Sequence, residues 1–413
     1  MPVHDLSAPS ASATVTFRNI FSVREIGGKK LLVNDGVRRR LVMLDASMSN
    51  PGVVLDSTSE GGNSYGPRAS PLIPFLADSS LFIDAPSLSL VVIDPNGKVA
   101  RVMSVPRPND LRFLAGSPSG VDAKGNLLYR VEASQKQLSL NQPNAGNATV
   151  VMQPQDSAPV SRANFERRSI DTVGYVRLDN GIRTTTTRTA DALITKLLVN
   201  PLVTIDDWTV LSDGTIAFVR GHDYHVDVIR PDGRALSGAK LPFDWKRLTD
   251  ADKQHLIDSA RTAIDQSQAT AKENKPTAGG ADAARNEMSA TMAMAAMSRG
   301  DAGGGNIASR SFKLLPPITE FVPISEIGEY YPPIRAGAAK ADADGNLWIL
   351  PTTSAQSKSG ELVYDVIDNR GALKKRVRVP VGRSIAGFGK GGVVYLMFRD
   401  ETSEWHLERR SFR

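Results

Sequence analysis

The chain has 413 residues, of which 41% are hydrophobic and 23% charged, with a formal net charge of +6 and no cysteine. The lack of cysteine excludes disulfides and thiolate sites, and no apolar run approaches the roughly 20 residues that cross a bilayer. With 34 glycines and 25 prolines but only one strong helical pattern, the sequence argues against a doubly wound α/β fold and favours short strands joined by turns.

The first segment, residues 1–13, has neither the basic nor the apolar region of a signal peptide. We expect a flexible leader of the kind that follows a cleavage site. A plain cytosolic start is the alternative interpretation.

From residue 14 onward, a short polar or glycine-containing turn followed by a β-rich run recurs near positions 28, 78, 125, 214, 345 and 391. A second hairpin with an aspartate-rich turn is predicted at 41–56, 90–105, 172–188, 225–241 and 362–379. The sixth unit has only 404–412, and we expect 14–21 to supply its missing strand.

Two hairpins make a four-stranded antiparallel sheet, and a ring of such sheets is a β-propeller. The sequence therefore predicts an all-β fold: one six-bladed β-propeller domain over residues 14–413, with the N-terminal strand closing the last blade. That closure removes the exposed sheet edges.

The stretch KADADGNLWIL (340–350) places three oxygen-bearing side chains around one glycine, which could indicate a calcium loop. An EF-hand loop needs glycine at position 6 and glutamate at position 12, whereas counting from Asp342 these positions hold Leu347 and Thr353. The pattern instead predicts a hairpin turn.

Two insertions interrupt the repeat, at about 132–170 and 243–333. The first is polar and predicts a solvated loop, with a folded-back cover over one face of the ring as the alternative. The second predicts a helix capped by Thr249 and Asp252, with an apolar face that would pack on the ring. That face consists of Leu256, Ile257, Ala260 and Ile264. Residues 270–308 are rich in glycine, alanine and methionine and are expected to be disordered.

The basic runs lie in separate units and aromatic residues make up only 6%, so we expect solvated outer strands and no nucleic-acid binding. His222 and His225 lie near Asp223 and Asp227, the densest set of candidate metal ligands. If this is a turn leading into a strand, the two imidazoles point to different faces. Polar hairpin residues are therefore predicted rather than a zinc site.

The runs VREI…LLVND…RRLVMLD, DSSLFID…LVVIDPNGKVARVMSVP and DADGNLWIL carry a resemblance. From Phe17 onward the chain resembles six-bladed propellers of the NHL-type, TolB-like and gluconolactonase-like group, and more narrowly uncharacterised bacterial propeller proteins. The resemblance implies a periplasmic or extracellular location, with the cytoplasm as the alternative. Gluconolactonase-like relatives hold calcium in the central channel, and Glu25 and Asp207 are the candidates here.

We expect a non-catalytic propeller that binds a ligand or protein at its top face and channel mouth. The channel-side residues with useful chemistry are Arg24, Glu25, Arg68, Asp207, Trp208 and Arg335. Three arginines suggest a protein, a peptide or a small anionic ligand, because guanidinium pairs well with carboxylates; salt bridges between blades are the alternative role. We expect a monomer without a cofactor, and a calcium-dependent lactonase or esterase is the alternative function.

Overall fold

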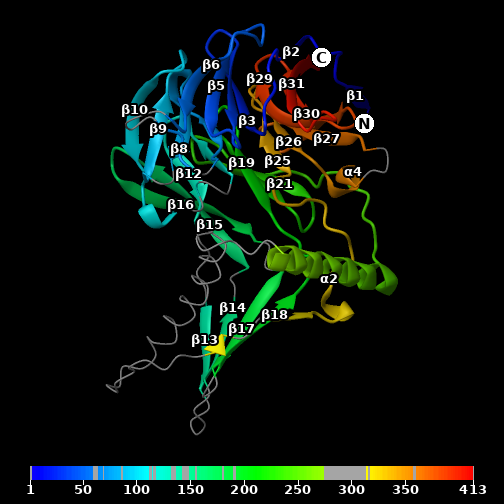
Figure 1. Ribbon diagram of the computed structural model, residues 1–413. Helices are drawn as coiled ribbons and strands as arrows, with labels where there is room; N and C mark the ends of the chain where they lie inside the picture. Colours follow the sequence, from blue (N-terminus) through cyan, green and yellow to red (C-terminus); the bar gives the residue numbers. More distant parts are fainter. Residues whose placement is uncertain are drawn as a thin grey trace, which may run out of the picture.

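A computed structural model describes residues 2–58, 64–67, 69–84, 87–110, 114, 118–131, 136–141, 148–153, 156–178, 181–188, 192–273, 313–314, 317–356 and 360–412. Within these ranges the chain is almost entirely β-structure, arranged in seven sheets (Figure 1). The helical segments are α2 (Asp250–Glu273), α4 (Thr352–Ala355), η1 (Leu76–Asp78), η2 (Pro108–Asp110) and η3 (Ile324–Glu326).

Six of the sheets are antiparallel meanders that follow one another along the chain, which is the arrangement of propeller blades. The first contains β3 (Ile20–Ile26), β4 (Lys30–Asp35), β5 (Arg40–Leu44) and β6 (Gly52–Asp56). The second contains β7 (Leu72–Pro74), β8 (Ser80–Asp84), β9 (Ser89–Ile93) and β10 (Val99–Ser104). The third contains β11 (Ser119–Val121), β12 (Leu127–Arg130), β15 (Ser157–Asn164) and β16 (Ser169–Arg177).

The fourth contains β19 (Asp207–Val210), β20 (Ile216–Arg220), β21 (His225–Ile229) and β22 (Ala235–Ser237). The fifth contains β25 (Ala339–Ala341), β26 (Leu347–Ile349), β27 (Leu362–Ile367) and β28 (Leu373–Val379), with β1 (Val3–Asp5) added parallel to β28. The sixth contains β29 (Ser384–Gly389), β30 (Val393–Arg399), β31 (Trp405–Ser411) and β2 (Ala11–Ser12).

The six sheets form a closed circuit. The first strands of neighbouring sheets contact one another from β29 through β3, β7, β11 and β19 to β25. The turn that follows each first strand also contacts the neighbouring sheet, either at its corresponding turn or at its first strand. These contacts join Gly27 to Asp78, Leu76 to Gly125, Ala123 to Gly214, Ser212 to Gly345, Asp344 to Gly391 and Lys390 to Glu25.

An apolar cluster fills each of the six interfaces in this circuit, so every sheet is buried on two faces. Pairs that face each other across successive interfaces are Leu32 and Phe82, Ile83 and Leu127, Leu128 and Phe218, Val219 and Ile349, Val366 and Val394, and Tyr395 and Val33. Burial of these side chains is the main force that holds the ring together.

The N-terminal segment closes the last sheet, as predicted, although with an earlier register. β2 pairs with β31 through Ala11–Arg409 and Ser12–Glu408, and an isolated bridge joins Phe17 to Trp405. The expected closing strand, 14–21, lies partly beyond this contact, because residues from Ile20 onward form the first strand of the first sheet. In place of a flexible leader over residues 1–13, β1 covers the edge of β28 and β2 pairs with β31.

The third sheet differs from the sequence-based expectation. Its second hairpin is β15–β16 rather than 172–188, so the chain returns to the sheet inside the segment expected as a loop, 132–170. The remaining strands are β13 (Lys136–Asn141), β14 (Ala148–Gln153), β17 (Ile182–Arg188) and β18 (Ala192–Val199). They pair with one another in that order and form a sheet of their own.

This seventh sheet, called the accessory sheet below, also receives strands from the second insertion. β23 (Lys313–Leu314) and β24 (Ile318–Phe321) pair parallel to β18. Figure 1 shows the accessory sheet standing away from the six other sheets, with α2 lying between the two parts. Strands from residues 136–199 and from residues 313–321, which are more than 100 positions apart, thus form one sheet.

Helix α2 begins where the capping pattern predicts. The Thr249 amide donates to the Asp252 carboxylate at 2.9 Å, and the Asp252 amide donates back to the Thr249 hydroxyl at 3.2 Å. The prediction that its apolar face packs on the ring is wrong. Ile257 lies in a cluster with Val322 and Ile327 of the returning chain, because that segment runs beside β18 and brings its own apolar side chains to the helix. Of the segment 270–308, which was expected to be disordered, residues 270–273 belong to α2 and residues 274–308 lie outside the described residues.

The acidic stretch at 342–346 is a hairpin turn, as predicted. Asp342 Oδ1 accepts the amides of Asp344 at 2.9 Å and Asn346 at 2.7 Å, and its Oδ2 accepts the indole N–H of Trp348 at 2.9 Å. Gly345 has φ = 83°, a backbone conformation that glycine adopts readily. The same acceptance of amides two and four residues later recurs at Asp45, Asp94, Asp122, Asp368 and Asp400, with a hydroxyl replacing the first amide at Asp400.

Candidate functional site

The predicted residues Arg24 and Glu25 join the first sheet to its two neighbours. Arg24 donates to the backbone carbonyl and hydroxyl groups at Ser79 and Ser80 and pairs with the Asp78 carboxylate at 3.0 Å. Burial lowers the pKa of Arg24 to about 10, although Asp78 acts in the opposite direction. The next residue, Glu25, reaches the other way and accepts the hydroxyl of Tyr395 at 2.6 Å. Both side chains therefore make inter-sheet hydrogen bonds.

Asp207 joins the fourth sheet to the fifth. It is 5% exposed and accepts the amides of Trp208 and Ala339, both at 2.9 Å. Burial raises the pKa of Asp207 to about 6, and the hydrogen bonds from the backbone only partly oppose that shift. Lys340 follows Ala339 on the same strand, where burial lowers the pKa of its ammonium group and Asp207 raises it.

Trp208 points away from Asp207 into the interface between the third and fourth sheets. It is 2% exposed and packs in a cluster with Leu128, Val160 and Phe218. Its indole N–H has no hydrogen-bond partner among the described residues. The side chain is a core residue, which the sequence could not distinguish from a ligand-stacking tryptophan.

Arg335 is exposed and contacts the loop that leads from the accessory unit into β25. Its guanidinium donates to the Tyr331 hydroxyl, and its central carbon lies 5.7 Å from the centre of the Tyr331 ring. The third arginine, Arg68, lies outside the described residues. Apart from the adjacent pair Asp207 and Trp208, no described hydrogen bond joins two of the predicted site residues, so their role in binding stays a prediction.

The histidine cluster forms a local hydrogen-bond network. The two ring nitrogens of His225 face Asp223 at 2.6 Å and Asp227 at 3.2 Å, and Asp227 also pairs with Arg220 at 2.7 Å. Partial burial acts to raise the pKa of Asp227, but hydrogen bonds from Arg220 and Ser237 and the charge of Arg220 hold it below its usual value. Among the described residues, no group of three or more histidine or acidic side chains is arranged to hold a metal ion.

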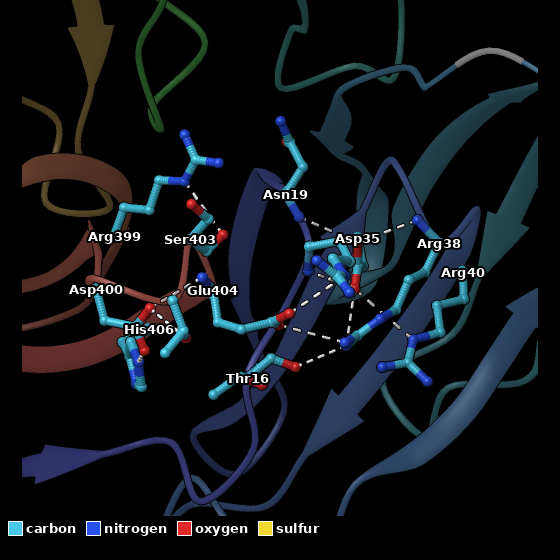
Figure 2. A network of polar contacts seen from close by, with 12 residues as sticks. Thr16, Asn19, Asp35, Arg38, Arg40, Arg399, Asp400, Ser403, Glu404 and His406 are labelled. Carbon is cyan, nitrogen blue, oxygen red and sulfur yellow. Dashed lines mark hydrogen bonds and ion pairs between the residues drawn. The ribbon is translucent and has the colours of Figure 1, made fainter.

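A polar network that sequence reasoning missed lies where the ring closes (Figure 2). Asp35 is fully buried and accepts the backbone amides of Arg18 at 3.2 Å and Arg38 at 3.3 Å. Arg38 also donates to the Thr16 carbonyl at 2.9 Å and pairs with Glu404 at 3.3 Å. The network ties the first sheet to the last hairpin. The basic runs of the sequence, of which Arg38–Arg40 is one, were expected on solvated outer strands, and only the fold reveals the acidic partners of Arg38 and Arg40.

A cleft of about 370 Å³ lies between the outer part of the fifth sheet and the loop that follows β22. Its lining consists of Val3, Pro242, Phe243, Asp244, Pro351, Thr353, Ser354, Glu361, Val363, Asp365 and Arg376. Its volume falls at the lower end of the range of small-ligand sites, and its lining mixes apolar and charged side chains as such sites do. None of these residues was predicted as a site residue, because five separate segments contribute them.

The deepest polar group of the cleft is already satisfied. Asp365 is almost fully buried, pairs with Arg376 at 2.8 Å and accepts the Tyr224 hydroxyl at 2.7 Å. Burial and the Asp365 charge raise the pKa of Tyr224 well above its usual value, so this hydroxyl stays protonated and donates. Arg376 also donates to the Pro242 carbonyl at 3.2 Å, which fixes the loop over the sheet.

A row of contacting aromatic rings leads from the cleft toward the accessory unit. Phe243 packs edge-on against buried Tyr224 at 5.6 Å and against Trp245 at 5.1 Å, and Trp245 contacts Tyr330 at 6.2 Å between ring centres. Trp245 is 39% exposed and Tyr330 is 46% exposed. Two neighbouring exposed aromatic side chains beside a cleft are typical of a contact surface.

No protein-family model and no curated protein matches the chain. Among solved structures, it is similar to a member of the DUF4221 family from Bacteroides vulgatus, at 8% identity and a TM-score of 0.41, covering 100% of this chain and 96% of that one. It is also similar to a virginiamycin B lyase from Staphylococcus aureus, at 9% identity and a TM-score of 0.36 over 96% and 97% of the two chains.

A third similar structure is a PQQ-bound aldose sugar dehydrogenase from Streptomyces coelicolor, at 9% identity and a TM-score of 0.37 over 99% and 97% of the two chains. At these values the similarities indicate nothing about the site or the activity of this chain. In the part of the chain that the structure describes, no helix is both long and apolar enough to cross a membrane.

Proposed function

We propose that this protein is a non-catalytic binding propeller that holds a ligand or a segment of a partner protein in the cleft beside Phe243. The proposal is supported by the cleft itself, where apolar lining residues and a fixed ion pair occur together with the exposed rings of Trp245 and Tyr330 nearby. The ring provides a rigid support for these groups, because the cleft is built on β27 and β28 of a sheet buried on both sides.

The channel mouth remains a second location for binding within this proposal. Arg24, Glu25 and Asp207 all hydrogen-bond to neighbouring sheets, so a ligand there would compete with contacts that stabilise the ring. The side cleft needs no such exchange and is therefore the favoured site. The same contacts occupy the two carboxylates on which the calcium-dependent lactonase alternative rests. Placement in the periplasm or outside the cell is part of the proposal and rests on the resemblance described above.

The proposal is tested by blocking the cleft. Thr353 is exposed and lines the cleft, so Thr353→Trp fills part of the space with little cost to folding. Ala263→Trp on the exposed side of α2 is the matched control, because it adds the same ring elsewhere. Arrays of short peptides and oligosaccharides are probed with the three full-length proteins.

We expect the arrays to contain ligands that bind both the unmodified protein and the control. The affinity of these ligands for Thr353→Trp should be at least about tenfold lower. Ligands bound equally by all three proteins would contradict the cleft as the site. Arrays without any retained ligand would contradict the proposed function.

A further inference from the structure

We infer that the cleft takes an extended peptide segment that carries a lysine or arginine side chain. This inference rests on the proposed function and deepens it by naming the chemical class of the partner. Three features support it: an open strand edge, an excess of carboxylates and neighbouring aromatic faces.

The open edge is that of β1. This strand pairs with β28 on one side only and stands last in the order of its sheet, and all three of its residues are exposed. Its outer backbone groups therefore have no strand partner among the described residues. An extended peptide can add to such an edge through main-chain hydrogen bonds while its side chains enter adjacent pockets. Val3 of this strand lines the cleft, so an added segment would run along it.

The charge of the cleft is opposite to that of the chain as a whole. The lining holds three carboxylates and one guanidinium, whereas the whole chain carries a formal charge of +6. Asp365 and Arg376 neutralise each other, and Glu361 lies 3.6 Å from Arg378, a cation that Asp5 also approaches at 3.4 Å.

Asp244 is exposed and has no ion pair among the described residues. Around the cleft, four carboxylates (Asp5, Asp244, Glu361 and Asp365) therefore face two guanidinium groups. A bound cation would bring the net charge around the cleft closer to zero, whereas a bound anion would make it more negative.

The row of aromatic rings provides a second attraction for a cation. Phe243 lines the cleft, and Trp245 and Tyr330 expose ring surface just beyond it. A lysine or arginine side chain can lie over such a face with its methylene groups in apolar contact and its charge near Asp244. A neutral peptide would gain only the apolar part of this interaction.

The inference is tested with two labelled hexapeptides of equal length, one alternating lysine with valine and the other alternating glutamate with valine. Fluorescence anisotropy measures binding to the full-length protein and to three variants. Asp244→Asn and Glu361→Gln remove cleft charges without changing side-chain size, and Glu401→Gln removes an exposed carboxylate from the distant hairpin between β30 and β31.

We expect the lysine peptide to bind at least about tenfold more tightly than the glutamate peptide. Each cleft variant should weaken it by about fivefold, the upper range for one exposed ion pair, and the Glu401→Gln control should not. Raising the salt from 0.05 to 0.5 M should weaken it further, because exposed charges are screened.

Equal or tighter binding of the glutamate peptide, or equal loss in the Glu401→Gln control, would overturn the cationic partner. If the glutamate peptide binds and Thr353→Trp abolishes that binding, the cleft remains the site and only the inference fails. If neither peptide binds at 1 mM protein while the arrays yield cleft-dependent oligosaccharides, the inference likewise fails and the proposed function stands.

Discussion

Replacement of Asp207 tests whether this predicted site residue acts as an inter-sheet contact. Asp207→Ala removes both carboxylate oxygens and leaves the partly buried amide of Ala339 without this hydrogen-bond partner. An unsatisfied buried donor costs about 1–3 kcal/mol. At neutral pH, however, the unmodified protein also carries the cost of a buried ionised carboxylate, which the variant lacks, so part of this loss is offset.

The pH dependence separates these two contributions. Because burial raises the folded-state pKa of Asp207 to about 6 from a usual value of 3.8, the folded protein binds a proton between these pH values that the unfolded chain releases. The stability contributed by this carboxyl is complete below about pH 3.8 and is lost as the pH rises through 6. The difference corresponds to about 3 kcal/mol, at 1.36 kcal/mol per pKa unit.

The assay is urea unfolding of the unmodified protein, Asp207→Ala and Asp207→Asn between pH 4 and 8, with the differences taken at each pH so that other titrating groups cancel. We expect the advantage of the unmodified protein over Asp207→Ala to be about 2–3 kcal/mol larger at pH 4 than at pH 8. Asp207→Asn keeps the shape of the side chain but does not titrate. The advantage of the unmodified protein over this variant should follow the same pH trend and be smaller at each pH. A difference that is constant with pH, or that grows as the pH rises, would refute a raised pKa at this position.

Three further predictions concern the ring. Glu404→Gln weakens the contact with Arg38 where the ring closes. Hydrogen exchange of the backbone amides near Phe17 should therefore accelerate severalfold, while the amides of the central strands stay protected. Unchanged exchange near Phe17 would show that the network does not hold the closure. Trp348→Phe removes the indole hydrogen bond to Asp342 and part of a fully buried ring, and should lower the free energy of unfolding by about 2–4 kcal/mol in urea titration; a loss below 1 kcal/mol would contradict the packing described. Because Asp342 is saturated by turn amides, 5 mM calcium and 5 mM EGTA should give the same melting temperature within about 1 °C in scanning calorimetry; a rise of several degrees with calcium would contradict the turn assignment.

Much of the propeller could be predicted from the sequence, because its determinants are local. An aspartate that accepts amides two and four residues later, as Asp342 does, leaves a readable signature at the hairpins where it occurs. The Thr249–Asp252 cap is equally local, and the start of α2 follows from it. The hairpin of the third sheet was misplaced because β17, with its run of threonines, has as strong a strand pattern as β15.

The accessory sheet and the cleft could not be predicted, because their determinants are distant in sequence. Parallel pairing of β18 with β24 joins residues about 120 positions apart, and no local pattern encodes it. Phe243 and Arg376 line one cleft only because the fourth and fifth sheets are neighbours. Arg24 and Asp207 lie on first strands, as expected from the sequence, but whether such side chains face a ligand or the next sheet depends on the packing.

The most direct test of the side cleft as the binding site is photo-cross-linking of the lysine–valine hexapeptide, carrying a diazirine group, to the full-length protein, followed by peptide mapping with mass spectrometry. The account predicts that the label attaches within 242–245, 351–363 and the first five residues, and that Thr353→Trp removes it. Attachment concentrated on the first strands, around Arg24 or Asp207, would contradict the account and return the binding site to the channel mouth.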